Sequence, residues 1–366
     1  MKKQLKFALG LLVSLAALYW AFKGVEFAKV WAELKKASVG WFALLVVATV
    51  YSQLVRAQRW DHLFRHLKRI ELGSLFSSTM VGIAANNVLP FRIGEAVRGY
   101  SIARKEGLPF TTCFTTVVLE RIFDMLTVLG LLAVMLMVVE VPEAAGPQVT
   151  QAAQAIGVLA VAVVGGIVFL FFKQELMLRW VDKLLALMPE KAAEPLRHMV
   201  HAFIKGLEAL TDTKQLLYLF GYSVWLRVTF AAAFAFAVKS FHLDANFGVP
   251  VVQAGFVTVL FVAIFVMVPA APGFVGTFQA GCIVALSIFG VPKDAALGYS
   301  LLAHAGQFIP ITFLGMIYFF REGISLSEVE KAGEPSPEAV EHEMEVLEKK
   351  QEEERDEEGD LKRAGS

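Results

Sequence analysis

The amino-acid sequence predicts an all-α polytopic membrane protein with about six full transmembrane helices and two re-entrant helical hairpins in an inverted repeat. Hydrophobic residues make up 56% of the 366 positions. The mean hydropathy of +0.58 is too high for a soluble globular protein. Apolar runs such as 41–55, 156–172 and 249–268 are near or at the length that crosses a bilayer core. Two segments rich in proline and glycine interrupt this pattern, one in each half of the chain.

The first elements follow from the alternation of apolar and basic segments. Residues 5–22 have a basic start and an apolar core without a small-x-small cleavage pattern before Lys23, which predicts an uncleaved first span. Residues 23–38 are typical of a short interfacial amphipathic helix, and 41–54 form a second span. The fourteen residues from 56 to 69 carry five positive charges, so the positive-inside rule predicts a cytoplasmic segment. These charges are Arg56, Arg59, Arg65, Lys68 and Arg69.

The first interrupted segment allows two interpretations. Residues 74–89 are apolar and rich in small side chains, whereas 91–105 carry Arg92, Glu95, Arg98, Arg104 and Lys105. In one interpretation the basic part is a cytosolic loop between ordinary spans. In the other, it is a broken element inside the membrane that lines a polar cavity, because such a charge density cannot face lipid. We favour a hairpin that enters from the cytoplasmic side, turns at Pro90 and returns.

The rest of the chain is divided by the same criteria. The predicted segments are a span at 110–139, an outer loop at 140–154, a span at 156–172, cytoplasmic helices at 173–214, a span at 215–238, a second hairpin that begins with 249–268, and a last span at 295–320. We expect residues 1–322 to form the membrane domain. Residues 323–366 are acidic and are predicted to form a largely disordered cytoplasmic tail.

The two interrupted segments match in the order of their prolines and glycines. Pro90, Gly94, Gly107 and Pro109 correspond to Pro272, Gly276, Gly290 and Pro292, with one extra residue in the second copy. The predicted repeats cover about 41–139 and about 215–320, and interrupted helices at matching places indicate a transport site near the midplane. A chain of eight ordinary spans has the same parity, so only the charges of 91–105 favour hairpins. The expected hinge residues are Pro90, Gly94, Pro272, Gly273 and Gly276.

A cluster of charged residues lies within the predicted span at 110–139. Glu120 and Asp124 share a helix face, and Arg121 is close enough in sequence to reach Asp124. Charges inside a membrane are paired or hydrated. They are either a structural brace that fastens the span to Arg92 or Arg98, or a functional group that positions Arg98 at a lipid headgroup or exchanges a proton.

Asparagines and arginines of the first hairpin are candidates for phosphate binding. The guanidinium groups of Arg92 and Arg98 offer paired donors for phosphate oxygens, and Asn86 and Asn87 lie beside them in sequence. The alternative is that these arginines only set the topology of the chain. That alternative requires positive charge but does not explain the Asn-Asn-x-x-Pro pattern.

Three further polar residues occur in predicted membrane segments. Arg227 lies within the span at 215–238, and its partner is either Glu95 or Asp124. His304 and Gln307 share one face of the last span, where a histidine is either a packed hydrogen-bonding group or a proton relay.

Several classes of chemistry have no signature in the sequence. We find no zinc-protease, P-loop, dinucleotide or Ser-His-Asp pattern. Cys113 and Cys282 lie far apart in apolar segments and are expected to be packed free thiols without metal-ligand spacing. The basic residues are spread over short segments between apolar runs. We therefore expect no cofactor, no metal and no nucleic-acid partner.

The motifs NNVLPFRIGEAVRGY, LERIFD, PAAPGFVGTFQAG and FGVP, in this order, lead to a family assignment. Together they resemble the flippase-like membrane domain of lysylphosphatidylglycerol synthases, over nearly all of residues 1–322. The resemblance implies movement of a charged or glycosylated lipid between leaflets of a prokaryotic inner membrane, with both termini cytoplasmic. Where synthases of the family carry an aminoacyl-transfer domain, this chain has only the acidic tail, so no enzymatic activity is expected.

The resemblance extends to individual residues. The family's first motif falls on Asn86, Asn87, Pro90, Gly94, Glu95 and Arg98, and its second on Glu120, Arg121 and Asp124. In the second copy, Phe274 replaces a glycine and Gln279 stands where a glutamate is usual. If that acid binds a cationic headgroup or a proton, this protein prefers a less cationic lipid.

The sequence therefore favours a lipid flippase without its own ATPase. The expected substrate-binding residues are Asn86, Asn87, Arg92, Glu95, Arg98, Glu120, Arg121, Asp124, Arg227, Gln279 and His304. Proton coupling through Glu95, Glu120 or Asp124 is a hypothesis. The alternatives are a solute transporter or channel, an intramembrane enzyme that uses Glu120 and Asp124 as acid and base, and a non-catalytic scaffold for a lipid-synthesis complex. The sequence is compatible with a homo-oligomer and leaves open the lipid, the direction of transport and the coupling ion.

Overall fold

The computed structural model describes residues 19–24, 27–65, 67–89, 93–138, 165, 183, 213–267 and 272–325. Within these residues all regular structure is helical, in agreement with the predicted all-α class. Several predictions concern positions outside them. These are Pro90, Arg92, most of the first span, the segments at 140–154 and 156–172, most of 173–214, and the tail beyond residue 325.

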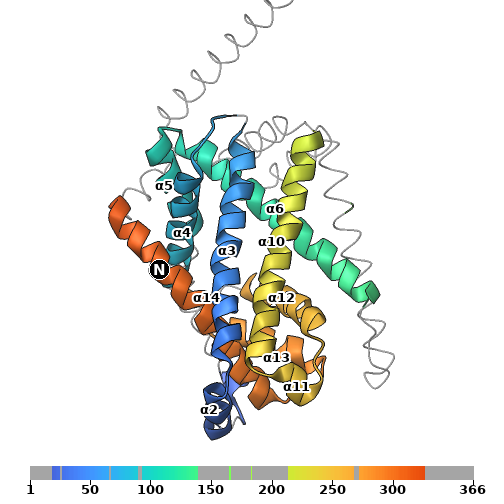
Figure 1. Cartoon of the computed structure of the whole chain (residues 1–366). Coiled ribbons are helices and arrows are strands. Elements are labelled where there is room, and N and C mark those ends of the chain that lie inside the picture. The colour runs from blue at the N-terminus through green and yellow to red at the C-terminus, as the bar shows by residue number, and fades with distance from the viewer. Residues whose placement is uncertain are drawn as a thin grey trace, which may run out of the picture.

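The described helices form a bundle of long helices (Figure 1). In chain order they are α2 (Phe27–Lys35), α3 (Val39–Phe64), α4 (Leu72–Val88), α5 (Gly94–Glu106), α6 (Phe110–Val138), α10 (Thr213–Ser240), α11 (Leu243–Phe247), α12 (Val251–Met267), the 3₁₀ turn η3 (Pro272–Phe274), α13 (Thr277–Ser287) and α14 (Lys293–Glu322). Helices α3 and α10 pack side by side at the centre. Helix α6 crosses the bundle obliquely, which brings its first half close to both of them.

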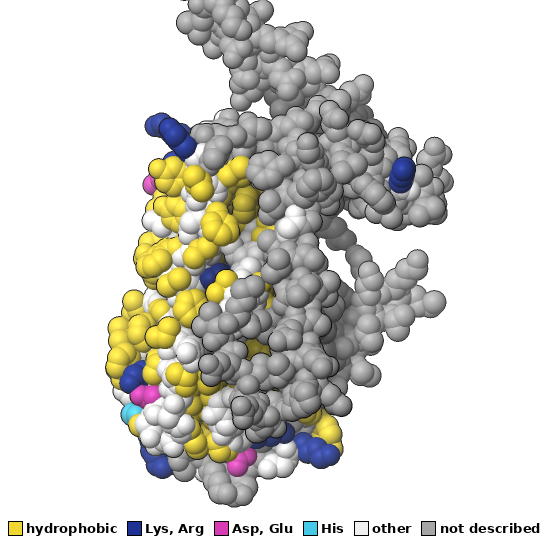
Figure 2. All heavy atoms as spheres, turned by 90° about the vertical axis from the view of Figure 1, so that its right-hand side faces the viewer, with side chains coloured by type: hydrophobic (Ala, Val, Ile, Leu, Met, Phe, Trp, Pro, Cys, Tyr) yellow, Lys and Arg dark blue, Asp and Glu magenta, His cyan; other side chains and the backbone are white. Residues whose placement is uncertain are grey.

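The outer surface of this bundle is suited to lipid. Three described helices are long and apolar enough to cross a membrane, namely Val39–Phe64, Lys214–Ser240 and Lys293–Glu322. Large apolar side chains such as Val47, Phe220 and Phe313 are exposed on them. In Figure 2 hydrophobic side chains run along most of the described surface, and charged ones gather mainly towards its two ends. The chain is thus an all-α membrane protein, and the count of six spans stays a prediction.

Helix α3 extends ten residues beyond the predicted end of the second span. The sequence placed it at residue 54, with Arg56 and Arg59 in a cytoplasmic segment. Helix α3 instead continues without a break to Phe64, and Arg59 is only 1% exposed. No proline or glycine interrupts residues 55–64, and carboxylates on a neighbouring helix compensate the buried charge. The positive-inside count therefore included Arg59, whose side chain is buried in the bundle, and the side of the membrane on which it lies stays a prediction.

Helices α4 and α5 form the first predicted hairpin, and their contact is very close. A Cβ atom on Gly94 would lie 2.0 Å from the carbonyl oxygen of Gly82. The side-chain oxygen of Asn86 accepts a hydrogen bond from the Gly94 N–H at 2.8 Å. Only glycine fits this approach of two backbones. The two helices thus pack as a hairpin, and its entry into the membrane stays a prediction.

Gly94→Ala is expected to loosen this hairpin. The added methyl group must separate α4 from α5, and such overpacking costs about 1–3 kcal/mol of unfolding free energy. Denaturant titration of the purified protein in detergent micelles measures the loss. Gly130→Ala in α6 is the matched control, because no atom lies within 4 Å of its added Cβ. Equal stability of the two variants would contradict the close contact between α4 and α5.

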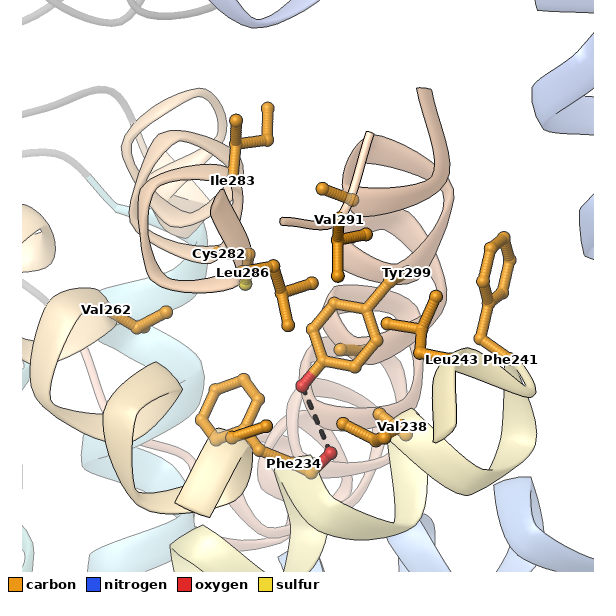
Figure 3. Close-up of a cluster of buried hydrophobic side chains, with 14 of the residues drawn as sticks. Phe234, Val238, Phe241, Leu243, Val262, Cys282, Ile283, Leu286, Val291 and Tyr299 are labelled. Atoms are coloured by element: carbon orange, nitrogen blue, oxygen red, sulfur yellow. Dashed lines mark hydrogen bonds between the residues drawn. The ribbon is translucent and has the colours of Figure 1, made fainter. Parts of the chain in front are cut away.

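The second half of the chain repeats this order of helices. Helix α10 is followed by α12 and α13, which pack closely, since a Cβ on Gly281 would lie 2.9 Å from the Cα of Val262. Figure 3 shows the apolar core between α10, α13 and α14. At its centre the hydroxyl of Tyr299 donates a hydrogen bond to the carbonyl oxygen of Phe234 at 3.0 Å. The core therefore fixes α14 against α10.

The matched glycines and prolines have matching structural roles at one end of each hairpin. Gly107 and Gly290 have positive φ angles of 66° and 71°. Pro109 directly precedes α6, and Pro292 directly precedes α14. The turns of the two hairpins also meet, because a Cβ on Gly273 would lie 3.6 Å from the carbonyl oxygen of Asn87. The inverted relation of the halves and the repeat boundaries stay predictions.

Candidate functional site

A group of buried charges lies where α3, α5, α6 and α10 meet. We call it the charge cluster. Its members are Arg56 and Arg59 of α3, Glu95 and Arg98 of α5, Glu120, Arg121 and Asp124 of α6, and Arg227 of α10. The residues come from four helices, so the cluster forms only when the bundle is assembled.

Glu120 is the centre of the charge cluster, and its side chain is fully buried. Four guanidinium groups surround one of its oxygens, Oε1. The distances to this atom are 2.7 Å from Arg121 Nη2, 2.9 Å from Arg98 Nη1, 3.2 Å from Arg59 Nη2 and 3.6 Å from Arg56 Nη1. The second oxygen, Oε2, has no hydrogen-bond partner among the described residues. Glu120 therefore joins α3, α5 and α6 through one atom.

Asp124 forms the second junction, one helical turn further along α6. Arg59 Nη1 donates to its Oδ1 at 2.8 Å and to the hydroxyl of Ser223 at 2.9 Å. Arg227 Nη2 lies 3.2 Å from the same carboxylate oxygen, and Arg121 Nη2 lies 3.3 Å from Oδ2. The sequence left open whether Arg227 contacts Glu95 or Asp124, and the structure shows contact with Asp124.

Arg98 is held on two sides. Its guanidinium group lies 3.7 Å from the ring centroid of Trp60, a cation–π arrangement. The indole N–H of Trp60 donates to the hydroxyl of Thr116 at 2.9 Å, which fixes the ring. A Cβ on Gly82 would lie 2.6 Å from the Cβ of Arg98, so the absence of a side chain there lets the arginine pass. Nη1 faces Glu120, while Nε and Nη2 have no hydrogen-bond partner among the described residues.

The charge cluster carries more positive than negative charge. It holds five arginines and three carboxylates, and the positive excess is at least two because guanidinium does not deprotonate in proteins. The side-chain exposure of Arg121 is 38% and that of Glu95 is 29%, against 3% or less for Arg59, Arg98 and Glu120. The cluster is thus open at Arg121 and Glu95 and closed around Glu120.

The predicted site residues do not all lie in this cluster. Asn86 contacts the hairpin backbone and lies 3.4 Å from Glu95, at the edge of the cluster. Asn87 donates to the hydroxyl of Thr312 in α14 at 2.8 Å, which joins the hairpin tip to the last helix. Arg92 lies outside the described residues. The structure therefore connects Asn86 to the charged residues but directs Asn87 elsewhere.

Gln279 and His304 form a separate polar pair between α13 and α14. The side-chain oxygen of Gln279 accepts from the Gly276 N–H at 2.7 Å, and its nitrogen lies 2.9 Å from His304 Nδ1. The imidazole ring stacks on Phe278 with centroids 4.4 Å apart. Gly273 and Gly276 have positive φ angles of 73° and 94°, as glycine permits at the start of a helix. This pair shapes the second hairpin turn, and its role in substrate binding stays a prediction.

Gln279→Leu is expected to destabilise this turn. The change leaves the buried Gly276 N–H without an acceptor, which costs about 1–3 kcal/mol. Gln279→Glu keeps an acceptor for that N–H and is expected to stay closer to the wild type. Denaturant titration in micelles compares the two variants. A leucine variant as stable as the glutamate variant would show that the cap contributes nothing.

Sequence reasoning missed four members of this site: Arg56, Arg59, Trp60 and Ser223. The two arginines were counted as surface charges, because a row of basic residues after an apolar run usually marks a cytoplasmic loop. Two signals were present. Residues 55–64 contain no helix breaker, and Glu120 and Asp124 in a membrane require more positive partners than Arg121 alone supplies.

Within the described residues, no group of three or more His, Cys, Asp or Glu side chains could hold a metal ion. Cys113 and Cys282, on α6 and α13, are both buried, and neither is part of a disulfide. The candidate site is therefore defined by guanidinium and carboxylate groups.

Fold and charge cluster together define an integral membrane protein with a polar site inside its helical bundle. Residues 7–315 match the family described as the lysylphosphatidylglycerol synthase TM region, and the chain belongs to this family. A stretch of 128 residues is 31% identical to the glycosyltransferase AglD of Haloferax volcanii. This stretch covers 35% of the chain but only 20% of AglD, so the chain is similar to about a fifth of that protein's length.

Proposed function

We propose that the protein is a flippase that moves a phospholipid or glycolipid with a polar headgroup between membrane leaflets by alternating access. The observation that carries the proposal is the charge cluster, in which five arginines face three carboxylates inside the bundle. Charges inside a membrane protein are paired or hydrated and mark substrate pathways, and a bound anion would compensate this positive excess. Phosphate is the anion that arginine binds most specifically, because two parallel N–H donors match two of its oxygens.

The geometry supports a particular mode of binding. The headgroup phosphate enters between Arg121 and Glu95, the exposed members of the cluster, and its acyl chains stay in the bilayer. Arg98 extends towards it from the short helix α5, and its Nε and Nη2 atoms, which have no partner in the described part of the chain, would donate to phosphate oxygens. Because α5 belongs to a hairpin that packs tightly on α4, both helices move together when access alternates. Protonation of Glu95, Glu120 or Asp124 is the proposed means of coupling.

Membrane location and topology complete the proposal. The supporting observations are the family membership and the apolar membrane-length helices. We propose a prokaryotic inner membrane, with both chain ends on the cytoplasmic side and with no catalysis by this chain itself.

A second candidate function is that of a membrane partner for a lipid-synthesis enzyme. It is favoured by one observation, namely that the region similar to AglD is a small part of a protein described as a glycosyltransferase. In that case the Arg98 contacts serve only assembly, and purified protein moves no lipid.

Lipid transfer in reconstituted liposomes distinguishes the two candidates. Labelled anionic, zwitterionic and aminoacylated phospholipids are compared for the wild type, Arg98→Gln and the control Arg65→Gln, whose side chain is exposed and pairs with Asp61. We expect headgroup-selective transfer that falls about tenfold or more in Arg98→Gln, through loss of charge-assisted contacts, and is unchanged in Arg65→Gln. A folded wild-type protein that transfers no lipid, with and without a pH gradient, would refute the flippase.

A further inference from the structure

The charge cluster contains information about the charge of its ligand. All five arginines stay protonated under any physiological condition. Even with Glu95, Glu120 and Asp124 all ionised, a positive excess of two remains, obtained from five arginines minus three carboxylates. Proton uptake by a carboxylate would only increase it. A ligand with one negative charge therefore leaves the buried cluster positive, whereas one with two negative charges neutralises it.

The donors that remain free are sufficient for such a ligand. Nε and Nη2 of Arg98 have no partner among the described residues, and the Nε atoms of Arg56, Arg121 and Arg227 are likewise unpaired there. The side chain of Arg98 is 97% buried, so these donors are shielded from bulk water. Unpaired buried donors are costly, and their number here indicates a ligand with several acceptor oxygens. A terminal phosphate offers three oxygens, against two free oxygens in a phosphodiester.

The placement of the carboxylates limits where the ligand lies. Glu120 contacts four arginines through Oε1, and its Oε2 is buried without a hydrogen-bond partner among the described residues. A second anion placed there would be repelled by this oxygen. Arg121 and Arg98 both contact Oε1 instead, and Arg121, with a side-chain exposure of 38%, is the most exposed arginine of the cluster. The ligand's phosphate therefore binds on the side of Arg121, where it enters from the surface.

We propose that the charge cluster selects a lipid whose headgroup carries two negative charges on a terminal phosphate, that is, a lipid phosphomonoester or diphosphate. A monoanionic phosphodiester or an aminoacylated, cationic headgroup is disfavoured. This proposal rests on the proposed lipid transport and specifies its substrate class.

Binding in detergent tests the proposal without transport. Full-length protein in an uncharged detergent at pH 8 is titrated with dioleoyl phosphatidic acid and with dioleoyl phosphatidylglycerol, and native mass spectrometry gives both dissociation constants. At this pH a phosphomonoester carries nearly two charges, since its second pKa is about 6. We expect phosphatidic acid to bind about tenfold or more tightly, because it forms additional charge-assisted hydrogen bonds. Binding constants within about twofold would overturn the proposal.

A variant that lowers the charge excess by one provides the matched comparison. Arg227 contacts Asp124 but not Glu120, and Arg227→Gln lowers the excess from two to one. We expect the preference for phosphatidic acid to fall from about tenfold to about threefold or less. Arg56→Gln makes the same change on α3 and serves if Arg227→Gln does not fold. An unchanged preference in a folded variant would refute the charge argument.

Inorganic phosphate and pyrophosphate distinguish a lipid from a free anion. We expect them to displace phosphatidic acid only at concentrations about a hundredfold higher, because they lack acyl chains that bury apolar surface. Displacement at equal concentration would overturn the lipid part of the proposal. Equal binding of both lipids, together with measurable transfer in liposomes, would refute the charge selectivity and leave the flippase intact. Selective binding of phosphatidic acid without any lipid transfer would support the charge selectivity and refute the flippase.

Discussion

Arg59→Gln is expected to destabilise the protein by about 3–5 kcal/mol, which is the usual cost of removing one partner from a buried ion-pair network. The side chain is 1% exposed and joins three helices: it starts on α3, donates to Asp124 of α6 and donates to Ser223 of α10. Without it, Asp124 keeps Arg121 and Arg227, but α3 loses its strongest bond to the carboxylates. Denaturant titration in micelles measures the change.

Arg65→Gln is the matched control for this prediction. Arg65 lies six residues later and contributes equally to the positive-inside count, but its side chain is 53% exposed and pairs with Asp61, one turn earlier. An exposed pair of this kind contributes about 0–1 kcal/mol. If the two variants lose equal stability, Arg59 is a surface residue as the sequence first suggested, and its side chain does not point into the bundle.

Arg59 and Arg65 show how much of the structure can be predicted from the sequence. Hydropathy and the positive-inside rule treat each residue by itself and by its neighbours in sequence. They predict that helices exist and where most of them lie, as for α4, α5 and α14. Whether a charge at the end of an apolar run is in water or in the interior depends on what another helix presents to it. For Arg59 that partner is Asp124, 65 positions away.

Glycine and proline patterns predicted more of the hairpins than hydrophobic patterns did. A positive φ angle at Gly107 and Gly290, and a proline directly before α6 and α14, are local properties that the residue types themselves impose. The sequence therefore showed that both segments are interrupted. It could not show that Gly94 contacts Gly82, or that Asn87 reaches Thr312, because those contacts depend on how the hairpins are packed.

Some candidate site residues could be found from the sequence alone, whereas the roles of others depend on the fold. Glu120, Arg121 and Asp124 were found because charges within an apolar helix are conspicuous whatever surrounds them. Trp60 was missed because an aromatic residue after an apolar run is ordinary. Its role depends on the guanidinium group of Arg98, which the fold places 3.7 Å from its ring. Gln279 and His304 were expected at the substrate, and the structure shows that Gln279 bonds to His304 and to the Gly276 N–H.

The second large effect is expected for Glu120→Gln. This change removes the carboxylate that four arginines share and raises the positive excess of the charge cluster from two to three. The amide also places an N–H group among guanidinium donors unless its oxygen takes the position of Oε1. We expect a loss of about 3–5 kcal/mol of unfolding free energy. We also expect lipid transfer to fall about tenfold or more, since Arg98 is no longer held in place. Glu106→Gln is the control, because Glu106 pairs with the exposed Lys68 at the bundle surface.

A double variant separates the loss of a contact from the change in charge. Arg98→Gln with Glu120→Gln removes both members of a pair 2.9 Å apart and returns the charge excess to two. Because the two residues share one network, we expect their effects not to add, and the double variant to be about 1–3 kcal/mol more stable than the sum of the single losses predicts. Transfer should remain low, since Arg98 is itself a proposed phosphate ligand. Additive losses would show that Glu120 and Arg98 act independently. Transfer restored together with stability would show that Arg98 only balances Glu120, so that the phosphate is bound by other arginines of the cluster.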